Sequence, residues 1–205
     1  MSRHESITGP AGTLQLMQEL PDGQPRALAV ICHPHPLHGG TLNNKIVHQL
    51  ARTFNQLGAV SVRFNFRGVG ASEGSFDEGR GEREDLLAVV DWASRQWPGL
   101  PIWLAGFSFG GFIAILAADS VQPERLVTVA PAVNYFAAQP VTVPVRDWLL
   151  IQGQDDDVVP AADVLSFIDR LKRPPALVMI EGVGHFFHGR LNDLKAAILE
   201  AYTER

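Results

Sequence analysis

A serine flanked by two glycines, in the motif Gly-Phe-Ser-Phe-Gly at residues 106–110, most constrains what this chain can fold into. An apolar strand-like stretch precedes the motif and an apolar helical stretch follows it. The pattern predicts a sharp strand-to-helix turn, because Gly106 and Gly110 leave room for the chain to double back on its neighbours. The following helix directs its free N–H groups at that turn. We therefore interpret Ser108 as a candidate nucleophile.

Short apolar runs typical of buried strands alternate with helical patterns along the rest of the chain. We expect strands at 14–20, 27–32, 60–66, 102–107, 126–130, 148–152 and 176–180. We expect helices at 44–57, 82–95, 111–118, 161–171 and 191–202. This alternation predicts a three-layer α/β/α sandwich, with a mostly parallel twisted sheet and an active site at the carboxyl ends of its strands. The first of these strands is expected to join antiparallel at an edge.

Length and composition indicate an ordinary globular protein. With 205 residues and no repeat or linker, we expect a single domain over residues 1–205. The net charge of −5 provides no basic patch, so we expect no nucleic-acid partner. The single cysteine excludes an intramolecular disulfide framework. Since no segment resembles a signal peptide or a membrane span, we expect no membrane association and a cytoplasmic location. No pattern indicates the oligomeric state.

A nucleophilic serine needs a general base and an acid that orients this base. Both residue types directly follow predicted strands, where a site in this architecture gathers its side chains. His185 comes after the 176–180 strand, and three consecutive aspartates come after the 148–152 strand. The chain order serine, acid, histidine agrees with a sheet-based α/β architecture. The acid remains open among Asp155, Asp156 and Asp157, and His188 competes with His185 as the base.

With these motifs the chain resembles the α/β-hydrolase superfamily, in particular its small, lid-free bacterial members akin to dienelactone hydrolases. The resemblance covers nearly the whole chain and also rests on two further segments, Cys-His-Pro-His-Pro-Leu-His-Gly-Gly at 32–40 and Phe-Arg-Gly-Val-Gly-Ala-Ser-Glu-Gly at 66–74. It implies an α/β-hydrolase fold without a large cap domain. The family pattern Gly-x-x-Asp-x-Val-Val-Pro selects Asp156 as the acid, and the resemblance implies His185 as the base.

The resemblance also implies an oxyanion hole with two backbone N–H donors. One is the N–H of Phe109, directly after the nucleophile. The other lies in the loop after the 27–32 strand, where His35 is nominated. Leu37 is the alternative, because Pro36 has no N–H to donate. This chain has Pro34 where relatives have a glycine after the loop's first histidine.

The position of the superfamily's usual lid predicts an open site. Segment 131–147 is too short for a helical cap, which favours small or exposed acyl groups as substrates. We expect Leu37, Phe107 and Tyr135 to line the site. The function that we expect is a serine hydrolase of the carboxylesterase type, which cleaves small esters through an acyl-enzyme. A peptidase, a thioesterase and a non-catalytic binding protein of the same fold remain open.

Three histidines suggest a different chemistry. His33, His35 and His38 have spacings at which imidazoles can share a cation, so a metal-dependent hydrolase also remains open. Pro34 and Pro36 stiffen this loop. We therefore expect it to shape the oxyanion site, with His33 or His38 hydrogen-bonded to nearby backbone, and we expect no metal or other cofactor.

Two further residues and one motif receive structural interpretations. Cys32 closes a predicted buried strand and is expected to pack as a small apolar residue. Arg67 is expected to form a structural salt bridge. The glycines at 68, 70 and 74 resemble a dinucleotide-binding fingerprint. However, their spacing differs from that motif and their turn does not follow the first strand of the sheet, so we expect no NAD site.

Overall fold

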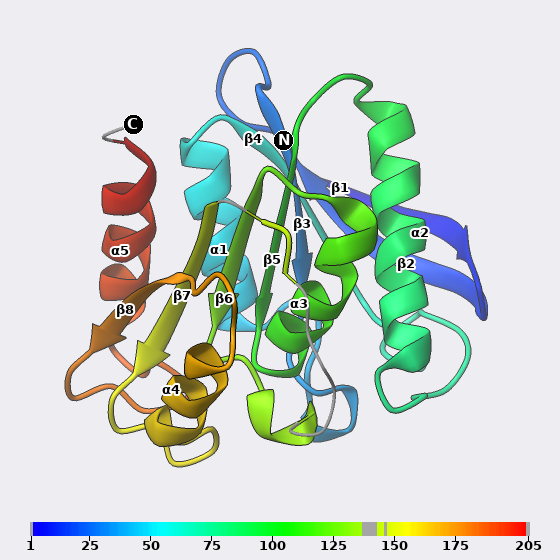
Figure 1. The fold of residues 1–205 in the computed structure, drawn as a ribbon. Coiled ribbons are helices and arrows are strands. Elements are labelled where there is room, and N and C mark those ends of the chain that lie inside the picture. Colours follow the sequence, from blue (N-terminus) through cyan, green and yellow to red (C-terminus); the bar gives the residue numbers. More distant parts are fainter. Residues whose placement is uncertain (1, 137–142, 146, 204–205) are drawn as a thin grey trace.

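The structure is a computed structural model that describes residues 2–136, 143–145 and 147–203. Within these residues, eight strands form one sheet in the order β1-β2-β4-β3-β5-β6-β7-β8 (Figure 1). The strands are β1 (Ser2–Gly9), β2 (Gly12–Glu19), β3 (Ala27–Cys32), β4 (Ala59–Phe64), β5 (Ile102–Phe107), β6 (Arg125–Val129), β7 (Asp147–Gly153) and β8 (Ala176–Ile180). The helices are α1 (Lys45–Gln56), α2 (Arg80–Gln96), α3 (Phe109–Val121), α4 (Ala161–Asp169) and α5 (Leu191–Thr203), with 3-10 turns η1 (Pro36–His38) and η2 (Val133–Phe136).

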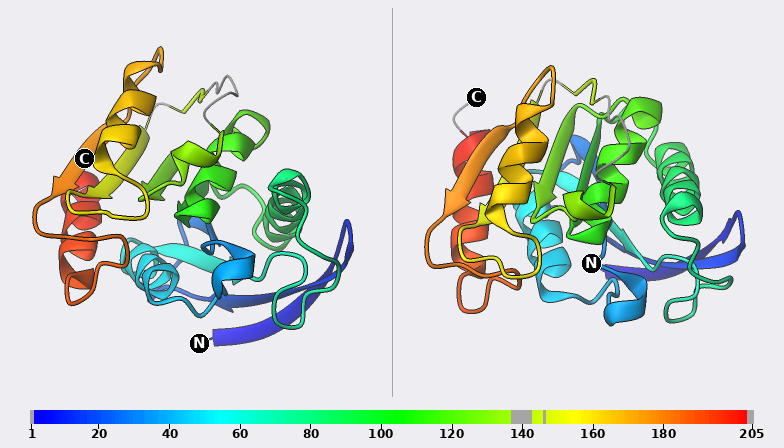
Figure 2. Two further views of the ribbon diagram at one scale, coloured as in Figure 1. Left: turned by 90° about the horizontal axis from the view of Figure 1, so that it is seen from below. Right: turned by 60° about the horizontal axis from the view of Figure 1, so that its bottom comes forward.

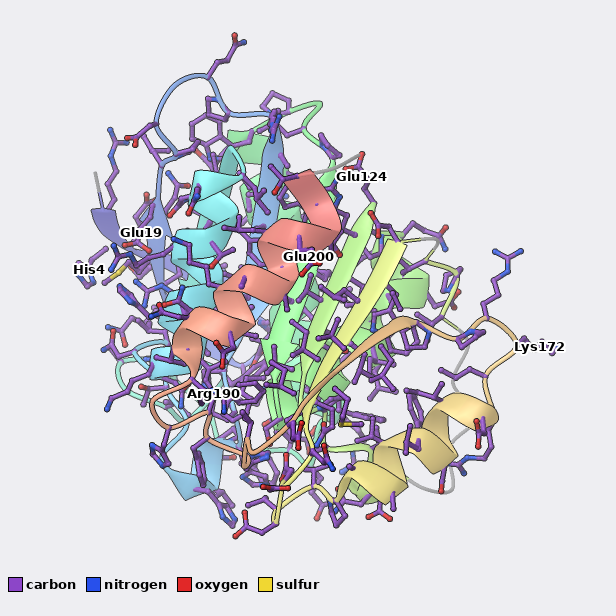
Figure 3. The ribbon with its side chains drawn as sticks, turned by 90° about the vertical axis from the view of Figure 1, so that its left-hand side faces the viewer. His4, Glu19, Glu124, Lys172, Arg190 and Glu200 are labelled. Carbon is purple, nitrogen blue, oxygen red and sulfur yellow. The ribbon has the colours of Figure 1, made fainter. Side chains whose placement is uncertain are left out.

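Helices cover both faces of the sheet, which confirms the expected three-layer sandwich. Helices α1 and α5 lie across one face, seen from the front in Figure 3. Helices α2, α3 and α4 pack on the other face. Helix α1 is amphipathic, with the buried residues Ile46, Leu50 and Phe54 on one side, and the Asn44 side chain caps its first turn. No helix in the described part of the chain is long and apolar enough to cross a membrane.

The antiparallel edge of the sheet differs from the sequence prediction. The expected 14–20 strand corresponds to β2, which does pair antiparallel, but it is not at the edge, because β1 lies outside it. The prediction missed β1. Among the residues of this strand whose burial is described, Ile7 alone is buried, so β1 shows no apolar run. The available signal was the short Pro10-Ala11 turn between Gly9 and Gly12, which is typical of a hairpin.

The parallel part of the sheet positions the site. Strands β3 to β8 run in the same direction, so their carboxyl ends meet at one edge. The loops after β3, β7 and β8 gather at this edge, at the bottom of Figure 1 and towards the viewer in Figure 2, right. No large cap interrupts the described residues between β6 and β7, which include only the short turn η2. The site is therefore built from the strand-end loops.

Candidate active site

Ser108 lies at the turn between β5 and α3, in an unusual backbone conformation. Its φ is 54° and its ψ is −119°, a region that residues other than glycine rarely adopt. Three hydrogen bonds hold this conformation. The Ser108 N–H donates to the Val129 carbonyl at 2.9 Å, and the Ser108 carbonyl accepts from the N–H groups of Phe112 and Ala132, each at 3.1 Å. The surrounding backbone therefore compensates for the strain.

The two glycines of the motif are required by close backbone contacts. A Cβ atom on Gly106 would lie 2.3 Å from the Gly110 carbonyl oxygen. A Cβ atom on Gly110 would lie 2.4 Å from the carbonyl oxygen of His33, in the loop after β3. The expected reason for the glycines is thus confirmed. The second contact also places the loop after β3 directly against the serine turn.

Three side chains from three loops form a continuous hydrogen-bonded chain. His185 Nε2 lies 3.1 Å from Ser108 Oγ, and His185 Nδ1 lies 2.8 Å from Asp156 Oδ2. All three residues are buried, with 7% of Ser108 still exposed. An ionised carboxylate can only accept, so Nδ1 carries the proton and Nε2 is left to accept from the serine hydroxyl. This arrangement can remove a proton from Ser108.

Asp156 is distinguished from its neighbours by the donors around it. Its Oδ1 accepts from the N–H groups of Val158 at 2.9 Å and Val159 at 2.7 Å. Burial alone raises the pKa of Asp156, but the hydrogen bonds from His185, Val159 and Val158 and the charge of His185 outweigh it and lower this pKa. Asp155 and Asp157 are exposed. Of the three aspartates, Asp156 is the one that the structure brings to the histidine.

The loop that carries His185 is anchored by Phe187. Phe187 is buried in the core, whereas Phe186 is 53% exposed. His188 is exposed, and its ring lies against that of Phe186. Phe107 has no exposed surface, and its ring centroid lies 5.0 Å from that of His185. We therefore assign Phe107 a packing role beside the imidazole instead of the expected contact with substrate.

One expected oxyanion donor, Phe109, directly follows Ser108, and the other, His35, lies in the loop after β3. Phe109 is the first residue of α3, so its N–H has no acceptor within the helix. The His35 ring packs against the Phe109 ring, with centroids 5.0 Å apart. The Leu37 N–H donates to His35 Nδ1 at 3.2 Å, which makes Leu37 a poorer second donor than the sequence suggested.

His33 is not available to share a metal with His35 and His38. Its Nδ1 lies 2.6 Å from the Pro34 carbonyl oxygen, and its Nε2 accepts from the Phe66 N–H at 3.1 Å. Both ring nitrogens are therefore occupied by backbone groups, one of the two arrangements expected from the sequence. Burial lowers the pKa of His33 to about 4, so its ring is neutral at pH 7. Within the described residues, no group of three or more histidine, cysteine or acidic side chains could hold a metal ion.

Exposed apolar side chains lie on the loops that carry the site. Leu37, after β3, is 69% exposed, and Val158, beside Asp156, is 47% exposed. Together with Phe186 they form what we call the apolar rim. Leu37 was expected here, whereas Phe186 and Val158 were missed, because a sequence does not show which apolar residues stay outside the core. The side chain of Tyr135 lies outside the described part of the structure.

The structural roles expected for two further residues are confirmed. Arg67 forms a buried ion pair with Asp85, with Nη2 and Oδ1 2.8 Å apart, which ties the loop after β4 to helix α2. Cys32 is fully buried, and burial raises the pKa of its thiol.

Comparison with known proteins identifies the family of this chain. The family model described as "Serine aminopeptidase, S33" (Hydrolase_4) matches residues 23–150, more than half of the chain. The chain belongs to this family of α/β hydrolases. The matched region of this hydrolase includes Ser108 and ends before the loops of Asp156 and His185.

Solved structures extend the likeness over nearly the whole hydrolase. A crystal structure of an α/β serine hydrolase without a lid from Xanthomonas campestris is 38% identical, with a TM-score of 0.95 over 99% of this chain and 94% of that one. An α/β serine hydrolase homologue from Coxiella burnetii is 44% identical, with a TM-score of 0.91 over 98% and 97% of the two chains. A monoacylglycerol lipase from Mycolicibacterium smegmatis is 28% identical over 100% of this chain and 79% of its own.

Proposed function

We propose that this hydrolase is a carboxylesterase that cleaves small esters through an acyl-enzyme on Ser108. The observation that carries the proposal is the hydrogen-bonded chain from Ser108 through His185 to Asp156. A serine hydroxyl is a weak nucleophile unless an oriented base removes its proton, and this chain provides such a base. The likeness to serine hydrolases and to a monoacylglycerol lipase supports the same chemistry.

The proposed reaction has two halves. In the first, Ser108 Oγ attacks the ester carbonyl carbon while His185 Nε2 takes the serine proton, and Asp156 stabilises the imidazolium. The Phe109 and His35 N–H groups are the proposed donors to the oxyanion. The tetrahedral intermediate then expels the alcohol, which receives the proton from His185. In the second half, water attacks the acyl carbonyl carbon while His185 takes its proton; the bond to Ser108 Oγ then breaks, His185 returns the proton to Oγ, and the carboxylic acid leaves.

The open site and the apolar rim support small or exposed acyl groups as substrates. No large cap covers the strand-end loops of the described structure. A long acyl chain of a substrate would therefore be surrounded by little protein along its length. Leu37 offers an exposed apolar side chain on the loop after β3. We propose Leu37 as a substrate-contacting residue.

A peptidase on the same triad is the second candidate, because the matching family model is that of a serine aminopeptidase. Both candidates pass through an acyl-enzyme on Ser108, so they differ only in the leaving group. Parallel assays of short-chain nitrophenyl esters and aminoacyl anilides distinguish them. We expect ester turnover to dominate, and turnover of anilides alone would replace the esterase proposal.

The test of the nucleophile is the intact mass of the protein after brief exposure to a fluorophosphonate, beside a Ser108→Ala control. We expect one adduct on the wild type and none on the variant. Labelling in the presence of a chelator checks the metal-dependent alternative, since the proposed mechanism is unaffected by chelation. An unlabelled but folded wild type would contradict the proposal and favour a binding protein of this fold.

A further inference from the structure

Gln152, near the end of β7, lies close to Asp156, the acid proposed to orient His185. Its side chain is fully buried, and its Nε2 lies 3.0 Å from Asp156 Oδ2. The same nitrogen lies 3.0 Å from the Val159 carbonyl oxygen and 3.3 Å from the Gly153 carbonyl oxygen. All three partners are acceptors, so the NH2 group and not the carbonyl must face them. The orientation of the Gln152 amide is therefore fixed.

The other end of this amide shows what the residue contributes. Gln152 Oε1 is buried and has no hydrogen-bond partner within the described structure. A buried carbonyl without a partner is unfavourable, and an apolar side chain of similar size, such as methionine, would fill the space without it. The favourable part of the residue is thus its NH2 group, and the Asp156 carboxylate is one of the three acceptors around this group and the only charged one.

The Asp156 carboxylate is shared between two side-chain donors. Oδ2 accepts hydrogen bonds from His185 Nδ1 at 2.8 Å and from Gln152 Nε2 at 3.0 Å. Oδ1 accepts hydrogen bonds from two backbone N–H groups. The backbone bonds fix where Asp156 sits. The Gln152 bond fixes the oxygen that faces the imidazole and takes up part of its negative charge.

We propose that Gln152 is a positioning residue of the active site. Its NH2 group fixes the Asp156 carboxylate against His185 and lowers the proton affinity of the Asp156–His185 pair. This inference rests on the proposed function, in which Asp156 orients the base. Without the Gln152 N–H donor, the Asp156–His185 pair binds an additional proton more readily, because the ionised carboxylate has lost a hydrogen bond. The pair then becomes active only at higher pH.

The test is the pH dependence of kcat/KM for a short-chain ester in the Gln152→Met and Gln152→Glu variants. We expect Gln152→Met to lower kcat about 10-fold with little change in KM, the effect of losing one hydrogen bond to a charged group. We expect the acidic limb to move to higher pH by on the order of one unit. Gln152→Glu should move it further, because a second carboxylate beside Asp156 also favours proton uptake.

Gln154→Met is the matched control. Gln154 has the same side chain two residues further along but is exposed, so neither kcat nor the acidic limb should change. A residue that merely fills space against the loop would, when replaced, lower the thermal midpoint and kcat without moving the acidic limb. That outcome in Gln152→Met would overturn the proposal.

A second measurement needs neither a variant nor turnover. In the wild type, the side-chain amide NMR signals of Gln152 should shift with the same midpoint as the ring signals of His185, and those of Gln154 should not. If the Gln152 amide signals do not shift as the His185 ring signals shift with pH, the proposal is contradicted even if the variants fail to fold. If the fluorophosphonate leaves Ser108 unlabelled while the two titrations coincide, the esterase proposal fails and the Gln152 contact stands.

Discussion

At the scale of single residues, the three side chains of the candidate site are held by contacts that differ in kind. The backbone of Ser108 is held in a strained conformation by hydrogen bonds to the neighbouring strand and helix. Asp156 is held by four hydrogen-bond donors, two of them backbone N–H groups. His185 is held between the other two and beside the Phe107 ring. Such rigid positioning is what proton transfer along the chain requires.

The identity of the orienting acid gives the first prediction. Asp156→Asn should lower kcat for a short-chain ester by about 10⁴-fold, since an amide in this place favours the wrong imidazole tautomer. Asp155→Asn and Asp157→Asn are matched controls, because both aspartates are exposed and have the same chemistry. Steady-state kinetics of the three purified variants provide the comparison. An equal loss in Asp155→Asn would show that the acid has been assigned to the wrong aspartate.

At the scale of elements, the loop after β4 and helix α2 are joined by charged groups inside the protein. Asp85 is fully buried and accepts from the backbone N–H of Arg67 as well as from its guanidinium. Glu82 accepts from the Gly79 N–H at 2.7 Å and so caps the start of α2. The predicted 82–95 helix therefore begins earlier, at Arg80. These carboxylates fix both ends of the loop.

The second prediction concerns the ion pair between these elements. Arg67→Met should destabilise the protein by about 3–5 kcal/mol, because it leaves the Asp85 carboxylate buried without its partner. The Arg67→Met/Asp85→Leu double variant should recover part of this loss. Arg95→Met is the control, since the Arg95–Asp91 pair is exposed and its loss should change stability by about 1 kcal/mol or less. Urea unfolding measures all three, and equal losses in the two single variants would contradict the role of burial.

At the scale of the whole molecule, a buried neutral histidine links folding to pH. His33 joins β3 to the segment after β4 through the hydrogen bond from Phe66, and both strands lie in the middle of the sheet. Its pKa is about 4 in the folded protein, below the usual value of about 6.5 in an unfolded chain. The unfolded state therefore binds the proton more readily between these two pH values. Folding is favoured above this window and weakened as the pH falls through it.

The third prediction follows from this linkage. The free energy of unfolding should fall by about 3 kcal/mol through His33 as the pH drops from about 6.5 to about 4, and then fall no further on its account. His33→Gln retains a side-chain acceptor for the Phe66 N–H and cannot titrate, so its stability should change less across the same window. Urea unfolding of both proteins at intervals from pH 4 to 7 gives the difference. A difference that is independent of pH would contradict the assignment to His33.

Local patterns in the chain were enough for most of the architecture. Apolar periodicity reports burial, so strands β3 to β7, the partly buried edge strand β8 and all five helices of the described structure were predicted within a few residues. Strand β1 was not predicted, because it is a polar edge strand in which Ile7 provides the buried contact. The serine turn was also predicted from its local motif, in which Gly106 is needed because a Cβ atom there would meet the Gly110 backbone four residues on; the contact that requires Gly110, with the His33 carbonyl, is long-range.

The contacts across the site depend on long-range register, which local patterns do not contain. Three adjacent aspartates are chemically equal in the sequence, and Asp156 differs because its loop turns its carboxylate towards Val158, Val159 and His185. Gln152 was part of a predicted strand and gained its significance only from the packing of that loop against it. The fold class and the candidate residue types are thus determined by local sequence patterns, because burial and turns depend on neighbours along the chain. Which side chains share a proton is fixed by how parallel strands align their carboxyl ends in space.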